Sequence, residues 1–272
     1  MLKLEEIENS ILNADCLDVL KKLPDKCVDL VITDIPYKIS VSQSAGAFGV
    51  KKRMHYKKEL ETISNGVSDD VLFELCRVMK KINIYIFCSK NQFLQMLDFF
   101  VKERKCNWQI ITWHKTNPIP ACGNSYMPDT EYCLFFREKG VFVGGEPKTK
   151  NTFYVTKTNK EDKKKYNHPT VKPEKIIENL IINSSNENDL VLDPYCGSGT
   201  VPAVCLKLKR KFIGIEIMKN HFMTANYRLM SIMAQQKLDL NIEPFNVGQK
   251  TNEDFQKTIS KLMLPCTPTQ VK

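Results

Sequence analysis

The sequence predicts an α/β fold with a doubly wound, mostly parallel sheet, because two kinds of segment alternate along most of the chain. Short apolar runs have the length of buried strands, and between them lie longer segments whose apolar residues recur at helical spacing. The 272 residues, 42% of them hydrophobic, are enough for one large domain with a sizeable core. We therefore expect one sheet with helices packed on it.

Six apolar runs are predicted to be strands: 28–33, 83–88, 108–113, 132–137, 190–193 and 212–216. Five segments are predicted to be helices: 69–81, 92–103, 173–184, 200–207 and 219–236. The helix at 173–184 shows the pattern most clearly, since a proline occupies its first turn and four apolar residues form one stripe.

Two polar, basic segments show no hydrophobic period, and both are too long to be simple connections. They span 38–65 and 138–168, and we predict that they are functional loops or a small lobe inserted in a domain formed by residues 1–236. The tail at 237–272 has a weak helical pattern, and the sequence assigns it no role.

The net charge of +9 is concentrated in the same two regions. Residues 38–58 contain six lysines or arginines and no acid, and residues 148–172 contain eight lysines against two acids. Each run alone could be a solvated surface. Two runs that bracket the middle of the chain instead favour a groove for a polyanion, of which nucleic acid is the obvious example.

Composition argues against export, membrane insertion and metal binding. No apolar run approaches the roughly 20 residues of a membrane helix, and the N-terminal segment lacks the apolar core of a signal peptide. The ten cysteines are scattered, and no two have the C-x-x-C spacing of a zinc site. We expect a cytoplasmic protein with reduced, buried thiols and no metal.

The stretch "LVLDPYCGSGTVPAVCLKLKRKFIGIEI" predicts a site for an adenosine-containing ligand. A strand ends at Asp193, a loop contains Gly197 and Gly199, a helix begins near Thr200, and a second strand ends at Glu216. Glycines let the backbone turn sharply beside a ligand, and an acid about 20 residues further on is placed to hold a ribose diol. The glycines alone would also fit an ordinary tight turn.

The stretch "LVITDIPYKIS" places an acid and an aromatic ring at the end of another predicted strand. Asp34 follows four apolar or β-branched residues, and Pro36 and Tyr37 come directly after it. Proline fixes its own backbone angle, so the turn that carries the carboxylate and the ring should be stiff.

These two stretches resemble motifs of the amino-directed DNA methyltransferases: "DPYCGSGT" is similar to the cofactor motif and "TDIPY" to the catalytic Asp-Pro-Pro-Tyr. Four further segments resemble the same family, namely "NADCLDVLKKLP", "WHKTNPIP", "EYCLFFRE" and "HPTVKP". The catalytic motif precedes the glycines, as in the permuted β class, and the match runs from about residue 13 to 236. One departure is Ile35, which replaces the first proline and should loosen the turn slightly.

The resemblance implies a Rossmann-like fold of the S-adenosylmethionine-dependent methyltransferase type. Its activity would be methyl transfer from S-adenosylmethionine to the exocyclic amino group of adenine in double-stranded DNA, with Asp34 favouring adenine over cytosine. The amino nitrogen is a poor nucleophile because its lone pair is delocalised into the ring. Asp34 would accept one N–H, the carbonyl of Ile35 or Pro36 the other, and Tyr37 would stack on the flipped base.

The resemblance also implies roles for further residues. Asp15 and Cys16 would meet the adenine end of the cofactor, Glu216 its ribose, and Lys172 or the nearby Thr170 its carboxylate. The turn around its methionine part would complete the cofactor set with Asp34, Asp193, Cys196, Gly197, Ser198, Gly199 and Thr200. From the basic runs, the DNA contacts expected are Lys51, Lys52, Arg53, Lys163, Lys164 and Lys165.

Several alternatives remain open from the sequence. The same fold could methylate cytosine amino groups, RNA or protein, although protein glutamine enzymes usually place their cofactor glycines first. A nucleic-acid-binding protein without activity is an interpretation of another class, and a Rossmann dehydrogenase would leave the "TDIPY" stretch without a role. A cognate restriction endonuclease is an optional partner, and the sequence does not choose between a monomer and a homodimer.

Overall fold

The computed structural model describes residues 2–37, 66–118, 124, 126–158, 163, 166 and 171–239. By its internal contacts the chain divides into two units, Met1–Ile232 and Met233–Lys272. The architecture and the site described below belong to the first unit, and only the last residues of the helix that ends at Asp239 fall in the second.

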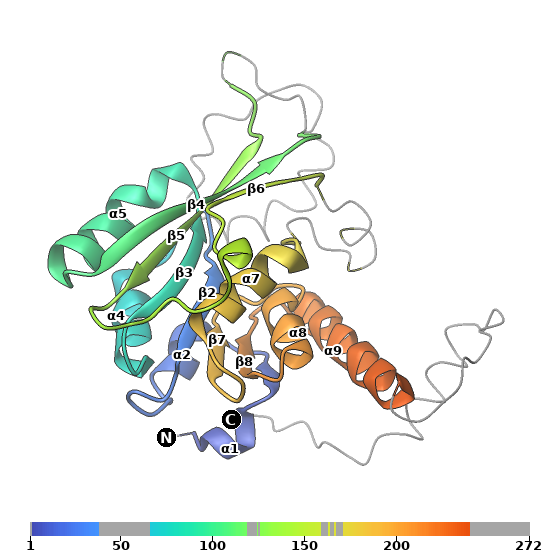
Figure 1. Cartoon of the computed structure of the whole chain (residues 1–272). Helices are drawn as coiled ribbons and strands as arrows, with labels where there is room; N and C mark the ends of the chain where they lie inside the picture. The colour runs from blue at the N-terminus through green and yellow to red at the C-terminus, as the bar shows by residue number, and fades with distance from the viewer. Residues whose placement is uncertain are drawn as a thin grey trace. The chain divides into compact units, whose positions relative to one another are not determined.

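The described part of the first unit is built on one eight-stranded sheet with the strand order β1-β8-β7-β2-β3-β5-β4-β6 (Figure 1). Every pair of neighbours is parallel except those that involve β5, which runs antiparallel to β3 and β4. This mostly parallel sheet confirms the predicted fold class. The strands are β1 Ser10–Leu12, β2 Leu30–Asp34, β3 Asn83–Cys88, β4 Asn107–Lys115, β5 Thr130–Arg137, β6 Phe153–Thr156, β7 Leu190–Asp193 and β8 Lys211–Ile215.

Helices pack on both faces of the sheet. The helical elements with described bounds are α1 Leu4–Ile7, α2 Cys16–Leu20, α4 Asp69–Val78, the 3-10 turn η2 Lys90–Gln92, α5 Phe93–Leu97, the π-helical turn η3 Asp98–Glu103, the 3-10 turn η4 Pro147–Thr149, α7 Glu174–Ser184, α8 Thr200–Lys207 and α9 Lys219–Asp239. The segment predicted as one helix at 92–103 is therefore three short consecutive helical pieces.

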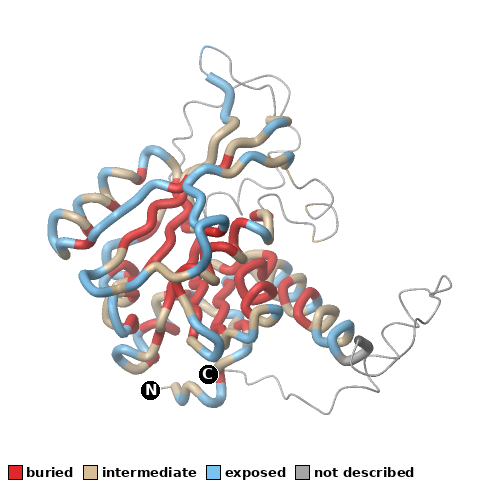
Figure 2. The backbone as a smooth tube through the Cα atoms, viewed as in Figure 1, coloured by how far each residue is buried: buried red, intermediate tan, exposed pale blue. Residues whose placement is uncertain are grey.

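Two apolar clusters form the core, one on each face of the sheet. One contains residues of α1, α2, α4 and α5, and the other contains residues of α7, α8 and α9. Alternate residues of β2 serve both clusters: Val31 belongs to the first, and Leu30 and Ile32 to the second. Such a strand is buried on both sides, which explains its uninterrupted apolar sequence. Figure 2 shows the central strands buried between the two helical layers.

The structure corrects the sequence-based prediction at two further places. The segment 138–168 is not wholly irregular, because it contains β6 and η4. Strand β6 lies at the edge of the sheet, where Phe153 and Val155 are exposed, so burial imposed no apolar pattern on it. Strand β1 and helices α1 and α2 were also missed, since elements of three to five residues are too short to show a period.

The described cysteines fit the expectation of free thiols. Eight of them are free and six of these are buried, and burial raises the pKa of Cys88 to about 12. No group of three metal-ligating side chains occurs among the residues that the structure describes. Within the same residues, no helix is both long and apolar enough to cross a membrane.

Candidate active site

Three carboxylates converge because the strands that carry them are parallel neighbours. Asp34 ends β2, Asp193 ends β7, and Glu216 directly follows β8, so all three lie at the same edge of the sheet. After β2 the chain packs helix α4 on one face, whereas α7 and α8 around β7 pack on the other. This is a switch point, the place where open α/β sheets bind ligands.

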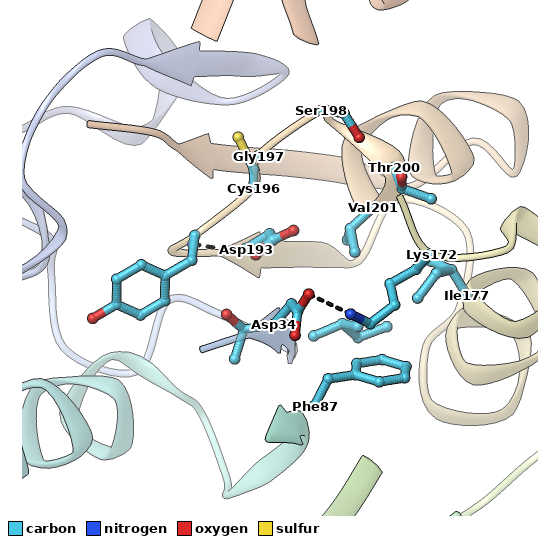
Figure 3. Close-up of a pocket in the computed structure, with 13 residues that line it drawn as sticks. Asp34, Phe87, Lys172, Ile177, Asp193, Cys196, Gly197, Ser198, Thr200 and Val201 are labelled. Carbon is cyan, nitrogen blue, oxygen red and sulfur yellow. Dashed lines mark hydrogen bonds and ion pairs between the residues drawn. The ribbon is translucent and has the colours of Figure 1, made fainter. Parts of the chain in front are cut away.

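A cleft opens at this edge (Figure 3). Seven of the predicted site residues line it, namely Asp34, Lys172, Asp193, Cys196, Gly197, Ser198 and Thr200. The six other predicted catalytic and cofactor residues, Asp15, Cys16, Pro36, Tyr37, Gly199 and Glu216, do not belong to its lining, and Thr170 lies outside the described residues.

The two glycines of the turn between β7 and α8 have different surroundings. Gly197 has φ +50° and its N–H donates to Oε2 of Glu216 at 2.9 Å. Gly199 has φ +72°, and a Cβ placed on it would lie 2.9 Å from the Cβ of Ala225 in α9. Gly197 therefore shapes the cleft, whereas Gly199 allows α9 to pack against the start of α8.

The acids of the site are held in a low-dielectric environment. Burial raises the pKa of Asp193 well above its usual range, and Asp34 and Glu216 add to the rise. Burial also raises the pKa of Glu216, although its carboxylate accepts hydrogen bonds from the N–H groups of Gly197 and Met218. Both shifts describe carboxylates that a nearby cation would stabilise in their charged form.

Asp34 presents two unlike carboxylate oxygens. Oδ2 forms an ion pair and hydrogen bond with the ammonium of Lys172. Oδ1 is shielded from solvent and has no hydrogen-bond donor of good geometry among the described residues, although the Tyr37 hydroxyl lies close enough to the carboxylate to lower the pKa of Asp34. An unsatisfied buried acceptor is costly, and a donor from a ligand would relieve that cost.

Two hydrogen bonds hold the turn that follows β2. The N–H of Ile35 donates to the carbonyl of Phe87 in β3 at 3.2 Å, a bond that a proline at this position could not make. The side chain of Gln92 donates to the carbonyl of Pro36 at 2.9 Å and accepts from Ser89. The departure at Ile35 thus replaces the stiffness of a proline ring with a bond to the neighbouring strand.

We expect Ile35→Pro, which recreates the family's tetrapeptide, to destabilise this protein. The change removes the N–H donor, leaves the Phe87 carbonyl without it, and shortens a side chain that is 1% exposed. The free energy of unfolding should fall by about 1–3 kcal/mol, as measured by urea denaturation. Ile35→Val keeps the N–H and is the matched control, with a loss of about 1 kcal/mol. An Ile35→Pro protein as stable as wild type would contradict the role given to this bond.

Asp15 and Cys16 have local structural partners. Oδ1 of Asp15 accepts the N–H groups of Leu17 and Asp18, and so caps the N-terminus of α2. The thiol of Cys16 donates to the hydroxyl of Tyr195 at 3.1 Å, and Tyr195 lines the cleft. The predicted contact of Asp15 and Cys16 with the cofactor stays a prediction, since neither belongs to that lining.

Sequence reasoning missed Arg228, which supports the turn at the start of α8. Its side chain is 1% exposed and donates to the Ser198 carbonyl, to Oγ1 of Thr200 and to Oε1 of Glu174. A single arginine within a predicted surface helix carries no signal of such burial. Gln92 was missed as well, because a glutamine at the start of the helix predicted at 92–103 gives no sign that its side chain is buried.

Of the predicted DNA contacts, only Lys163 lies among the described residues. Burial lowers its pKa, as do the ammonium groups of Lys115 and Lys172, while Glu131 opposes them. Lys163 is therefore close to the cleft and its charged neighbours. The predicted contacts Lys51, Lys52, Arg53, Lys164 and Lys165 lie outside the described residues.

A sheet of this order, with a glycine turn and an acid-proline-aromatic turn at one edge, defines a nucleotide-cofactor enzyme of the Rossmann-like class. The family model described as DNA methylase, which covers N6- and N4-directed enzymes, matches residues 28–227. The chain belongs to this family of amino-directed DNA methyltransferases. Its activity is therefore S-adenosylmethionine-dependent methylation of amino groups in DNA.

Related proteins agree over most of the chain. The Type II methyltransferase M2.LlaDCHI of Lactococcus lactis subsp. cremoris is 31% identical over 244 residues, 82% of this chain and 90% of its own. The Type II methyltransferase M.HinfI of Haemophilus influenzae is 27% identical over 276 residues, 89% of this chain and 75% of its own. The crystal structure of the M1.HpyAVI–SAM complex superposes with a TM-score of 0.57 at 29% identity, covering 81% of this chain and 98% of that one.

The residues of the cleft fit S-adenosylmethionine. The cofactor carries a sulfonium and an ammonium, and the buried Asp193 beside Asp34 is the kind of acid that such cations stabilise. Gly197 brings a backbone free of side-chain bulk to the cleft wall, next to Ser198 and Thr200. When bound, the cofactor supplies a methyl group already activated for transfer.

Proposed function

We propose that this protein is a site-specific DNA methyltransferase that acts on the N6 amino group of adenine. The observation that supports this most directly is Asp34, whose buried Oδ1 lacks a hydrogen-bond donor among the described residues at the edge of the cleft. An amino N–H of the target base is a donor of the right kind. The acceptor draws electron density toward nitrogen and favours its nucleophilic form.

The second amino N–H goes to the carbonyl of Ile35. Pro36 is the less suitable acceptor, because its carbonyl already accepts the Gln92 side chain at 2.9 Å. The Ile35 N–H bond to Phe87 holds the peptide group before Ile35, and the Gln92 bond to the Pro36 carbonyl holds the peptide group after Pro36, so the Ile35 carbonyl lies between two fixed groups. Two acceptors held by the backbone of a sheet then aim the nitrogen lone pair at the methyl group.

Because Oδ1 of Asp34 is shielded, a base must enter the site fully in order to reach it. A base within a duplex cannot do so, and we infer that the target nucleotide is flipped out. Tyr37 directly follows this turn and provides an aromatic face on which the flipped base stacks.

The basic segments 38–65 and 138–168 supply the DNA-binding surface in this proposal, with base-reading side chains chiefly in 140–166. Their lysines and arginines neutralise phosphates, and the described Lys163 lies close enough to Lys172 of the cleft for their charges to interact. The relatives named as Type II methyltransferases support a role in restriction-modification. A partner endonuclease is not needed for methylation itself.

The proposal is tested by expressing the protein in cells free of adenine and cytosine amino-methylation and analysing their DNA. We expect N6-methyladenine in hydrolysed nucleosides, and sequencing that detects modified bases should place it in one short recognition sequence. Asp34→Ala, expressed at the same level, is the control and should give unmodified DNA. Unmodified DNA from cells with soluble wild-type protein would contradict the function.

Cytosine N4 methylation is the second candidate, and the same nucleoside analysis decides it. The solved PvuII DNA methyltransferase, described as cytosine-N4-specific, has a TM-score of 0.61 at 14% identity, so the two share a fold. We prefer adenine because the first position of the tetrapeptide is Asp34, whereas the cytosine enzymes of this family tend to have serine there. N4-methylcytosine in place of N6-methyladenine would reverse this choice.

A further inference from the structure

Lys172 is buried between two carboxylates at the edge of the cleft. Its side chain is 7% exposed, and its ammonium pairs with Oδ2 of Asp34 and with Oε2 of Glu131 at 3.1 Å. Figure 3 shows it extending toward Asp34 from the segment before α7. A buried ammonium needs such partners, because leaving it unpaired costs several kcal/mol.

Glu131 continues this set of charges away from the cleft. It lies on β5, and its Oε1 pairs with Lys115 of the adjacent strand β4 at 2.6 Å. The side chains of Lys115 and Glu131 are 16% and 17% exposed, so solvent screens their interaction only weakly. Four residues of alternating charge thus form a chain that ties Asp34 to β5 and β4.

Anchoring one oxygen of Asp34 fixes the direction of the other. With Oδ2 held by Lys172, the carboxylate cannot rotate freely, and Oδ1 stays where no described residue donates to it. The alternative role for Lys172, binding the carboxylate of the cofactor, would require an ammonium already shared between two acids to serve a third.

We propose that Lys172 and Glu131 are positioning residues: Lys172 orients Asp34 toward the target amino group, and Glu131 holds Lys172 in place. This inference rests on the proposed function and adds two residues to it. Lys172 acts on Asp34 directly, whereas Glu131 acts only through Lys172. The two variants should therefore be strongly non-additive.

The charges around Asp34 support this assignment. Burial raises the pKa of Asp34, the Lys172 ammonium opposes that rise, and Glu131 adds to it. Burial alone would lower the pKa of Lys172, but Asp34, Tyr37 and Glu131 hold it well above its usual range. The other described titratable groups that interact with Asp34 are Tyr37, whose hydroxyl lowers the pKa of Asp34, and Cys88, Cys133 and Asp193. Lys172 is the cation among these described groups, so its loss should raise the pKa of Asp34.

The test compares Lys172→Met, Glu131→Gln and the double variant with wild type. Lys172→Met should lower kcat by about 100-fold at neutral pH, the size expected when a reacting group is misplaced by about 1 Å. The acid limb of its pH–kcat profile should move to higher pH, because the pKa of Asp34 rises. The affinity for S-adenosylmethionine, measured by calorimetry, should change by less than about threefold. Lys175→Met is the matched control, since Lys175 is exposed and pairs with Glu178, and it should change none of these quantities.

Glu131→Gln should lower kcat by about tenfold in wild type. In the Lys172→Met background the same change should leave kcat unchanged or raise it, because Glu131, then paired among the described residues only with Lys115, no longer holds Lys172 and only disfavours the charged form of Asp34. Melting temperatures check that each variant folds. If the kcat losses of the two single variants multiply in the double variant, the inference about Glu131 is wrong. If Lys172→Met retains kcat but binds S-adenosylmethionine tenfold more weakly, the inference about Lys172 is wrong. An inactive wild type would instead contradict the proposed function.

Discussion

Replacing Asp34 with alanine is expected to lower the rate of methyl transfer by about 10³-fold, within the range found for loss of a charged group that acts at the reacting atom. The variant removes the acceptor for the amino N–H but leaves the glycine turn intact. Lys172 keeps Glu131 as a partner, so the fold should survive. The affinity for S-adenosylmethionine should change by less than about threefold. Methylation is measured with a labelled methyl group, and cofactor binding by calorimetry.

Asp34→Asn is the graded control for this prediction. It keeps the shape of the side chain and one acceptor oxygen but loses the charge that pairs with Lys172, so its activity should lie between those of wild type and alanine. An Asp34→Ala protein that methylates DNA at near wild-type rates would remove Asp34 from the mechanism.

The second large effect is expected from Gly197→Val. A β-branched residue strains the backbone at φ +50°, and its side chain would enter the cleft wall beside Ser198. The change also disturbs the N–H that Glu216 accepts. We expect the affinity for S-adenosylmethionine to fall by about 100-fold, equivalent to about 2.7 kcal/mol of binding free energy at 25 °C. Calorimetry with the purified variant measures it.

Gly199→Ala tests whether this effect is specific to Gly197. Its new Cβ would meet Ala225 rather than the cleft, so the free energy of unfolding should fall by about 1–3 kcal/mol while cofactor affinity is retained. If Gly197→Val binds the cofactor as wild type does, the cofactor does not lie against this turn.

The convergence of Asp34, Asp193 and Glu216 could be predicted from the sequence, because each acid follows an apolar run with the pattern of a parallel strand. Their common edge then follows from the fold class alone. The partners of these acids could not be predicted. Lys172 and Asp34 are 138 positions apart, and their pairing depends on how two segments pack against one sheet.

The two glycines show a similar limit. The sequence correctly places Gly197 and Gly199 in one turn, and both adopt positive φ. It cannot show that Ala225 of α9 lies against Gly199, because that contact depends on helix packing. Likewise, Phe153 and Val155 gave no strand signal, since an edge strand with exposed apolar residues lacks the burial from which strands are recognised.

The strand order has a consequence for how the protein is made. Strand β2 lies between β3 and β7, and Asp29, just before β2, accepts a hydrogen bond from the N–H of Leu190, 161 positions later. At about 5–20 residues per second, a ribosome takes roughly 10–30 s to bridge that interval. During this time one edge of the apolar strand β2 has unpaired backbone N–H and C=O groups, so the nascent chain is prone to aggregation and to binding by chaperones. The carboxylates of β2 and β7 meet only after this delay, so a chain released early has no cofactor cleft and cannot modify the genome.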